Sequence, residues 1–506
     1  MTVEQGEDER EVIPRWRPFE SSIRTGELDA LSPAPLEAIE PELGKLRDEY
    51  EKTRNPFIAG DLLSALVASK AKQSEIDQLA EAILLSGDAE DSLQRFATRL
   101  LNPDETPDEQ GDRLRPTSID ASRAVVRRMR RLLRHDPRNA VRRVDLALAQ
   151  LTLGNRDAAR RQIRAALSLA PSNRFVLRST VRFLISENAP DEAVFVLRHS
   201  EQREQDPWIL AATLSAAQLA DMPVAHARQA REMLSSQDFA PRDLSELASE
   251  LATLEIHAGR MKRARLLFQQ ALIDPNENSV AQADWASSVS GLTLPQELLQ
   301  IARGYEARSR AFAREGNWNA ATSEGIAWQR DEPFALEPAL NTSYAAALGL
   351  EDFDTALEVA RIGLRSNPED ALLRNNAAYA AASLGRVNEA REFMDGIQGF
   401  DDESGFNTFQ ATHGLVLFRE GNFPAGRLKY QEALDGFARS ARRDLIPMAT
   451  ILWALEEIRI GSSLSTNLVK HARRYAKESD HPDTPLLLER LNRRVAQSPL
   501  SEEQFQ

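Results

Sequence analysis

The stretch TLGNRDAAR at residues 152–160 has a second copy, SLGRVNEAR, at residues 383–391. Both copies hold a leucine–glycine pair, and an alanine follows five residues after the glycine. Aligning the chain on this glycine yields three more copies: HAGRMKRAR at 257–265, REGNWNAAT at 314–322 and REGNFPAGR at 419–427. The same short pattern therefore recurs along most of the chain.

The spacing of the copies predicts the fold class. With three weaker copies that lack the glycine, the aligned positions are 154, 188, 222, 259, 316, 351, 385 and 421, and most steps are 34 to 37 residues. Such periods are typical of stacked helix pairs, because one pair cannot bury its apolar stripe alone. Glycine breaks the chain between the two helices, and a proline such as Pro171 ends the second one. The sequence predicts an all-α solenoid.

Residues 140–173 carry the pattern best, with Ala147 on the first helix, Gly154 at the turn, Ala159 on the second helix and Pro171 at its end. This unit resembles the tetratricopeptide repeat, and the resemblance extends over about 140–440. It implies a right-handed α-solenoid of helix pairs. It also implies that the first helix of each pair lines a concave groove. The helical patterns before and after the array predict extra helices at both ends.

The domain boundaries follow from periodicity and composition. The step from Gly259 to Gly316 is 57 residues, which predicts an irregular insertion at about 275–300. The expected parts are a disordered acidic, proline-containing tail (1–35), an N-terminal helical region (36–101), a polar linker (102–118), the repeat array (119–440), C-terminal capping helices (441–497) and a short tail (498–506).

The search for chemistry argues against an enzyme. Cysteine is absent, which excludes disulfides, thiolate zinc sites and cysteine nucleophiles. The common nucleotide-binding, hydrolase and zinc-protease motifs are also absent, and no histidine has a second histidine three or four residues away. We therefore expect no catalytic residue, no metal and no cofactor.

Composition also bears on location. The first ten residues, MTVEQGEDER, are acidic, and the chain has no run of 18 apolar residues that could span a bilayer. We expect a soluble cytoplasmic protein with no membrane contact. Arginine outnumbers lysine 55 to 8, which we interpret as the coding bias of a bacterium.

Charge is strongly segregated along the chain. The net charge is −14, yet residues 113–182 hold eighteen arginines and four aspartates, for a local charge of +14. Four of these arginines share one face of a predicted amphipathic helix at 119–135, and three more recur every four residues on the first helix of a later unit. We predict that they form one arginine face that binds a partner: Arg123, Arg127, Arg131, Arg134, Arg174, Arg178 and Arg182.

Several occupants of this face stay open. An acidic protein partner is favoured, because guanidinium forks suit carboxylates, and the chain would then be a scaffold or regulatory subunit. Nucleic acid is the alternative, although Phe175 is the one aromatic residue in the window that bases could stack on. A solvated face without a ligand and an enzyme with an unrecognised site are further possibilities. Some members of the family bind the C-terminal carboxylate of a peptide with a basic residue and an asparagine in the groove. We do not infer such a site, because Arg178 and Arg182 occupy these two positions and the asparagine is missing. The oligomeric state is left open.

The N-terminal tail offers two more hypotheses. The acidic residues EQGEDERE at 4–11 could lie on the arginine face, and deletion of residues 1–13 should then tighten partner binding. Trp16 and Phe19, in PRWRPF at 14–19, either form a linear docking motif for a partner or pack on the chain's own first helices.

Overall fold

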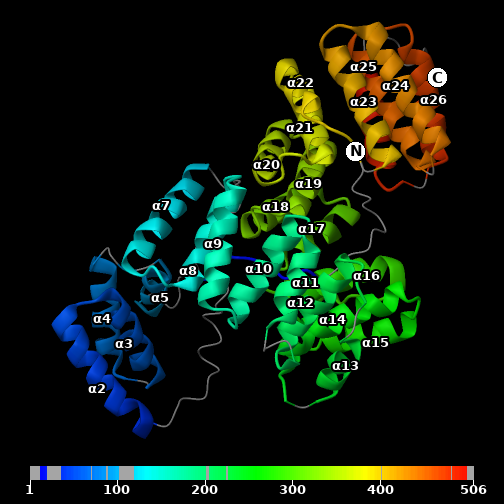
Figure 1. The fold of residues 1–506 in the computed structure, drawn as a ribbon. Helices are drawn as coiled ribbons and strands as arrows, with labels where there is room; N and C mark the ends of the chain where they lie inside the picture. The colour runs from blue at the N-terminus through cyan, green and yellow to red at the C-terminus, as the bar shows by residue number, and fades with distance from the viewer. Residues whose placement is uncertain are drawn as a thin grey trace. The chain divides into compact units, whose positions relative to one another are not determined.

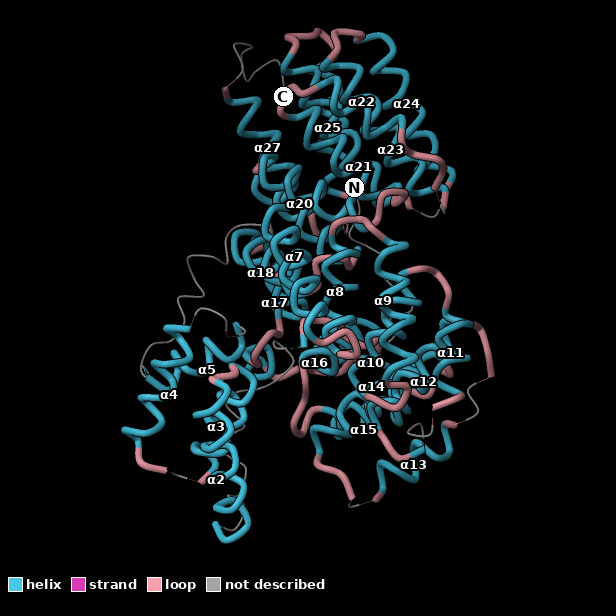
Figure 2. The backbone as a smooth tube through the Cα atoms, turned by 60° about the vertical axis from the view of Figure 1, so that its left-hand side comes forward, coloured by secondary structure: helices cyan, strands magenta, loops and turns pink. Residues whose placement is uncertain are grey.

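The protein is all-helical in the parts that the computed structural model describes: residues 12–19, 36–69, 71–86, 89, 91–101, 119–200, 204–223, 226–236, 238–400, 402–440, 442–479 and 481–497. Figure 2 shows helices and connecting loops over these ranges and no strand. The predicted all-α fold is confirmed. The chain divides into two compact units, one of Pro18–Asp112 and one that joins Met1–Arg17 to Arg113–Gln506.

In the part of the smaller unit that the structure describes, four helices pack around their own apolar core. Leu63, Leu66, Ala80 and Ile83 are buried in that core. The helices are α2 (Leu36–Thr53), α3 (Pro56–Ala68), α4 (Gln73–Ser86) and α5 (Asp91–Leu101).

The larger unit is a solenoid in which each helix packs on the helices that precede and follow it (Figure 1). It begins with α7 (Ile119–His135). The first half of the array holds α8 (Ala140–Thr152), α9 (Arg156–Leu169), α10 (Arg174–Ser186), α11 (Pro190–Arg198), α12 (Pro207–Leu219), α13 (Ala227–Ser235), α14 (Pro241–His257) and α15 (Met261–Ala271). The second half holds α17 (Tyr305–Arg314), α18 (Trp318–Asp331), α19 (Leu336–Tyr344), α20 (Phe353–Ser366), α21 (Ala371–Ser383), α22 (Val387–Asp395), α23 (Glu403–Arg419), α24 (Phe423–Arg439), α25 (Ile446–Arg459), α26 (Ser465–Lys477) and α27 (Thr484–Ala496).

The aligned sequence positions are the turns between paired helices. At Gly154 φ is +78°, the amide of Asn155 donates to the carbonyl of Gln150 at 2.9 Å, and the amide of Gly154 donates to Leu151 at 2.8 Å. These two bonds define a Schellman helix end. The copies without glycine form the same left-handed turn, at Asn188 with φ +55° and Glu351 with φ +57°. In the third unit the left-handed residue is Asp221, one residue before the aligned position 222.

The 57-residue step between Gly259 and Gly316 holds an additional helix. It is α16 (Glu277–Ser290), followed by the short 3₁₀ helix η3 (Gln296–Gln300). Asn276 caps α16, and its side chain accepts a hydrogen bond from the amide of Ser279 at 2.8 Å. Because α16 packs on both α14 and α17, it continues the row of first helices across the step.

Helix α20 returns to the start of the array. The hydroxyl of Ser366, the last residue of α20, donates to the carbonyl of Leu151 at 3.0 Å, and Arg156 donates to the carbonyl of Ser366. At Gly154 a Cβ atom would lie 2.6 Å from the carbonyl oxygen of Arg365. The solenoid therefore closes on itself between α8 and α20.

The C-terminal helix α27 covers an irregular turn after α19. Residues Ala345–Gly349 form a π-helix, a geometry that leaves carbonyl groups without their usual partners. Arg490 of α27 donates to the carbonyl of Leu348 at 2.5 Å, and Tyr344 donates to Asp483 just before α27. In all the helices that the structure describes, none is both long and apolar enough to cross a bilayer.

Candidate functional site

Residues 12–17, the inner segment, lie inside the closed part of the solenoid. The segment is dark blue in Figure 1 and passes beside α10. Val12 is 1% exposed and Trp16 is fully buried. The prediction of disorder over 1–35 is wrong for these six residues, because burial and ion pairs hold a segment that has no helical periodicity of its own. The acidic residues 4–11 lie outside the described part of the chain.

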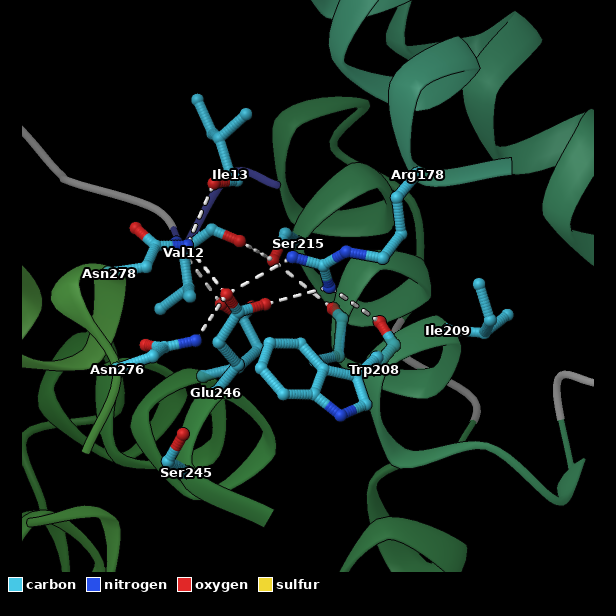
Figure 3. A network of polar contacts seen from close by, with 12 residues as sticks. Val12, Ile13, Arg178, Trp208, Ile209, Ser215, Ser245, Glu246, Asn276 and Asn278 are labelled. Atoms are coloured by element: carbon cyan, nitrogen blue, oxygen red, sulfur yellow. Dashed lines mark hydrogen bonds and ion pairs between the residues drawn. The ribbon is translucent and has the colours of Figure 1, made fainter. Parts of the chain in front are cut away.

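The array holds the backbone of the inner segment through side chains of its first helices. Glu250 of α14 accepts a hydrogen bond from the amide of Val12 at 3.3 Å. Ser215 of α12 donates to the carbonyl of Val12 at 2.9 Å, and Asn278 of α16 donates to the carbonyl of Ile13 at 2.9 Å. The contacts of Ser215 and Asn278 are seen in Figure 3. All three contacts are made to main-chain groups, so they recognise an extended main chain whatever its side chains are.

A buried carboxylate organises the floor of the groove. Glu246, 2% exposed, pairs with Arg178 at 2.8 Å and accepts from the amides of Asn276 at 2.8 Å and Asn278 at 3.3 Å (Figure 3). The guanidinium of Arg178 also lies 4.8 Å from the ring centre of Trp208 and donates to its carbonyl at 3.2 Å. The network fixes α10, α12, α14 and α16 around the segment.

Each arginine of the inner segment lies between two carboxylates. Arg15 donates to Glu306 of α17 and to Glu332 after α18. Arg17 pairs with Glu277 of α16, and its Nε lies 2.5 Å from the carboxylate of Asp331 at the end of α18. The two arginines thus have four acidic partners: Glu277, Glu306, Asp331 and Glu332. The groove around the segment is therefore acidic.

The pKa values in this cluster reflect burial against charge. Burial raises the pKa of Glu277, but Arg17 outweighs burial and lowers that pKa to about 2. Burial also opposes the ionised form of Glu332, yet Arg15 lowers its pKa. For Asp331 burial dominates, and with the help of Glu332 it raises the pKa despite Arg17. The charged forms of Glu277 and Glu332 thus depend on Arg15 and Arg17.

Trp16 fills an aromatic pocket between the two arginines. Its ring centre lies 6.3 Å from that of Phe183 on α10 and 5.3 Å from that of Phe334 before α19, both in edge-to-face geometry. The guanidinium of Arg182 lies 5.0 Å from the centre of Phe334 on the same wall. Within the described part of the chain the indole N–H has no acceptor. The pocket therefore recognises the aromatic ring and not its polar group.

The structure places three of the seven predicted arginines on α10 and the other four on α7. Arg178 and Arg182 belong to the interior just described, and Arg174 pairs with Asp206 at 2.5 Å while half of its side chain stays exposed. The other four, Arg123, Arg127, Arg131 and Arg134, are exposed on α7 and are called the α7 arginine surface below. Phe19 of the predicted docking motif is half-buried and belongs to the smaller unit.

The carboxylates of the groove were not identified from the sequence. One signal was available in QRDEPF at 329–334. Asp331 and Glu332 stand at the C-terminal end of α18, where the helix dipole disfavours negative charge. Acids at such a position need a cation nearby, and Arg15 and Arg17 supply it.

No group of histidine, aspartate and glutamate side chains in the described ranges is arranged to hold a metal ion. The site consists of an acidic and aromatic groove with an occupant from the same chain, together with the exposed α7 arginine surface. These are features of a binding protein.

Comparison with known proteins agrees with the repeat architecture. A family model described as a tetratricopeptide repeat matches residues 346–404, which include the turn at Gly385. This part of the chain is therefore similar to the tetratricopeptide repeat. No curated protein sequence matches the chain.

Comparison with solved structures also finds similar chains, two of which follow. The crystal structure of the APC/C hetero-tetramer Cut9-Hcn1 has a TM-score of 0.38 and 13% identity, covering 96% of each chain. The crystal structure of yeast Tom70 has a TM-score of 0.29 and 13% identity, covering 91% of this chain and 93% of that chain. The repeat family fits a protein-interaction scaffold.

Proposed function

We propose that this chain is a non-catalytic scaffold that binds an acidic segment of a protein partner at the α7 arginine surface. The proposal rests on the exposure of these side chains and on their lack of strong ion pairs. Among the described residues Arg127, Arg131 and Arg134 are exposed and make no ion pair. Arg123 has a contact with Asp120 at 3.3 Å, in which both side chains are largely exposed. Such exposed pairs contribute little.

The local potential supports the same proposal. Arg365 at the end of α20 is partly buried, and burial and then the charge of Arg123 lower its pKa. The positive charge of Arg123 is therefore felt where α20 approaches the start of the array. Carboxylates of a partner would relieve this repulsion and would form charge-assisted hydrogen bonds with the guanidinium forks.

Nucleic acid is the second candidate for this surface. Phosphates would be neutralised as carboxylates are, and binding would then fall steeply with salt. Against it, Phe175 is the one aromatic in the basic window and is half-buried on α10, so bases have no exposed ring to stack on there. The cytoplasmic location, the bacterial origin and a regulatory role stay predictions.

The test uses the full chain with Arg127→Glu, Arg131→Glu and Arg134→Glu. The matched control reverses three exposed cations on α13 and α15: Arg228→Glu, Lys262→Glu and Arg263→Glu. Binding of a fluorescent deca-glutamate peptide and of a fluorescent single-stranded oligonucleotide is measured by anisotropy at two salt concentrations.

Loss of peptide binding in the α7 variant but not in the control, with unchanged melting, supports the protein-binding proposal. Tight oligonucleotide binding with weak peptide binding assigns the surface to nucleic acid. Equal binding of both probes by all three proteins contradicts a dedicated surface. Pull-down from a native lysate after nuclease treatment then names the partner.

A further inference from the structure

We propose that the groove around the inner segment is a binding site for a partner segment with an aromatic residue between two arginines, and that residues 12–17 occupy this site until such a partner replaces them. The inference does not depend on the α7 arginine surface. It rests on the contacts by which the groove holds Val12 to Arg17.

The first argument is the mode of backbone recognition. The inner segment forms no helix of its own, and side chains of the first helices hold its amide and carbonyl groups: Glu250 and Ser215 at Val12, and Asn278 at Ile13. Any extended chain presents the same groups at the same spacing. A segment of another protein can therefore make the same main-chain contacts.

The second argument is the charge of the groove. Glu277, Glu306, Asp331 and Glu332 are all turned to the two arginines of the segment. Without those arginines, four acids would be left together in a largely buried space, with Arg310 still paired to Glu306 at 3.1 Å, and this is costly. The groove needs an occupant with two cations, and that need selects Arg-aromatic-Arg chemistry over neutral or acidic segments.

The third argument is the aromatic pocket. Phe183 on α10 and Phe334 in the turn before α19, far apart in sequence, both contact the Trp16 ring. The indole N–H finds no acceptor in the described part of the chain. The pocket is thus shaped for a ring of this size but does not require tryptophan. A partner with phenylalanine at this place would fit without an unsatisfied donor.

The fourth argument is that the helices have apolar contacts of their own. Val144, Ala147, Ile163 and Leu177 are buried against other helical residues in the cluster that Trp16 joins. Helix pairing in the array therefore does not depend on the segment alone. The segment is added to a framework that the repeats build, as a ligand is.

The inner segment has the advantage of covalent attachment. A tethered segment has an effective concentration that can reach the millimolar range, so a free peptide with a dissociation constant near 10 µM would appear about 100-fold weaker to the intact chain. A partner must match or exceed the chemistry of the inner segment, or arrive when that segment is displaced. The groove is thereby kept closed to weak ligands.

The first experiment measures binding of a fluorescent peptide of residues 11–19 to two full-length proteins. One is the wild type, and the other carries Arg15→Glu, Trp16→Ala and Arg17→Glu. We expect the variant to bind the peptide about 100-fold more tightly than the wild type, and a peptide with Trp16→Ala to bind neither. Arg127→Glu with Arg131→Glu serves as control and should leave the weak binding by the wild type unchanged.

The second experiment keeps the sequence of the segment and so avoids loss of folding. A protease site is inserted in the full chain after residue 25, and cleavage converts the inner segment into a non-covalent ligand. We expect the cleaved piece to stay bound in gel filtration, to exchange with labelled wild-type peptide and to resist exchange with the Trp16→Ala peptide.

The outcomes of both experiments are decisive. A cleaved piece that never exchanges makes the segment a fixed structural strut and overturns the proposal. Immediate loss of the piece, with no binding of labelled peptide at 100 µM, overturns it as well. A doubled mass in light scattering, with segments exchanged between copies, assigns the groove to a second copy of this chain instead of a different partner.

Discussion

The guanidinium of Arg15 donates a hydrogen bond to the carboxylate of Glu332, 317 residues further along the chain. Both side chains are almost fully buried. Arg17 repeats the arrangement with Glu277 and Asp331. A short segment that precedes the smaller unit is in this way part of the interior of the larger one, and the predictions below start from that contact.

Replacement of Trp16 should destabilise the larger unit, and the loss should be greater when no aromatic ring remains. Trp16→Ala removes a fully buried side chain and should cost about 3 to 5 kcal/mol. Trp16→Phe keeps the edge-to-face contacts and removes an N–H without an acceptor, so it should cost less than half as much. Chemical denaturation measures both, and Phe195→Ala, at a ring that is 65% exposed, is the control. Equal losses for the two Trp16 variants would contradict the pocket.

Acid should release the inner segment. The pKa of Glu277 is about 2 and that of Glu332 is lowered in the folded protein, so both acids stabilise docking above their ordinary value of 4.5. That contribution is lost as pH falls from about 4.5 toward 2. The raised pKa of Asp331 acts with the opposite sign, since its protonated form is favoured in the folded state.

Fluorine NMR of protein labelled with 5-fluorotryptophan measures this release, and Trp16→Phe assigns the resonance. We expect the Trp16 signal to move to the position of an exposed indole below pH 4.5, before the other tryptophan signals change. A Trp16 signal that keeps its buried position until the whole unit unfolds would contradict the linkage.

Gly154→Ala should be more harmful than Gly259→Ala, although both residues have left-handed backbones, with φ +78° and +70°. The conformational strain for alanine is about 1 kcal/mol or more in both. At Gly154 the new Cβ would also lie 2.6 Å from the carbonyl of Arg365, whereas no atom lies within 4 Å at Gly259. Thermal melting of the two variants measures the difference, which isolates the contact between α8 and α20. Identical melting temperatures would mean that this contact yields easily.

Glu246→Ala should cost about 3 to 5 kcal/mol, because it leaves the guanidinium of Arg178 largely buried without its carboxylate. The matched control is Glu232→Ala, whose pair with Arg228 is exposed and should change stability by less than 1 kcal/mol. Urea denaturation of both full-length variants measures the two costs. A small effect of Glu246→Ala would mean that the pair with Arg178 contributes little to the free energy of unfolding.

The turns of the repeat were predictable from the sequence because a helix end is a local event. The glycine of TLGNRDAAR marks a left-handed residue, and even the weaker copies placed the turn at Asn188 and Glu351. In the third unit the prediction was one residue off, because the turn between α12 and α13 has its left-handed residue at Asp221 and not at position 222. Local spacing therefore determined the register to within one residue.

The inner groove was not predictable in the same way. PRWRPF has no periodicity, and it could be a docking motif for a partner or a segment packed on its own array. Its partners Glu277, Glu306 and Glu332 belong to separate helices or helix ends. Among the 77 acidic residues of the chain, Glu277 and Glu306 carry no local signal of burial. Arg178 and Arg131 were both predicted to bind a partner, because the carboxylate that pairs with Arg178, Glu246, is also far away in sequence.

By itself the sequence determined the class of this protein: an all-α repeat solenoid, its helix ends, its lack of cysteine chemistry and its segregated charge. These are properties of neighbouring residues and of composition. Tertiary structure alone decided which charges are free and which are paired. Closure of the array from α8 to α20 brings residues hundreds of positions apart into one groove, and only there does an acidic wall meet Arg15, Trp16 and Arg17.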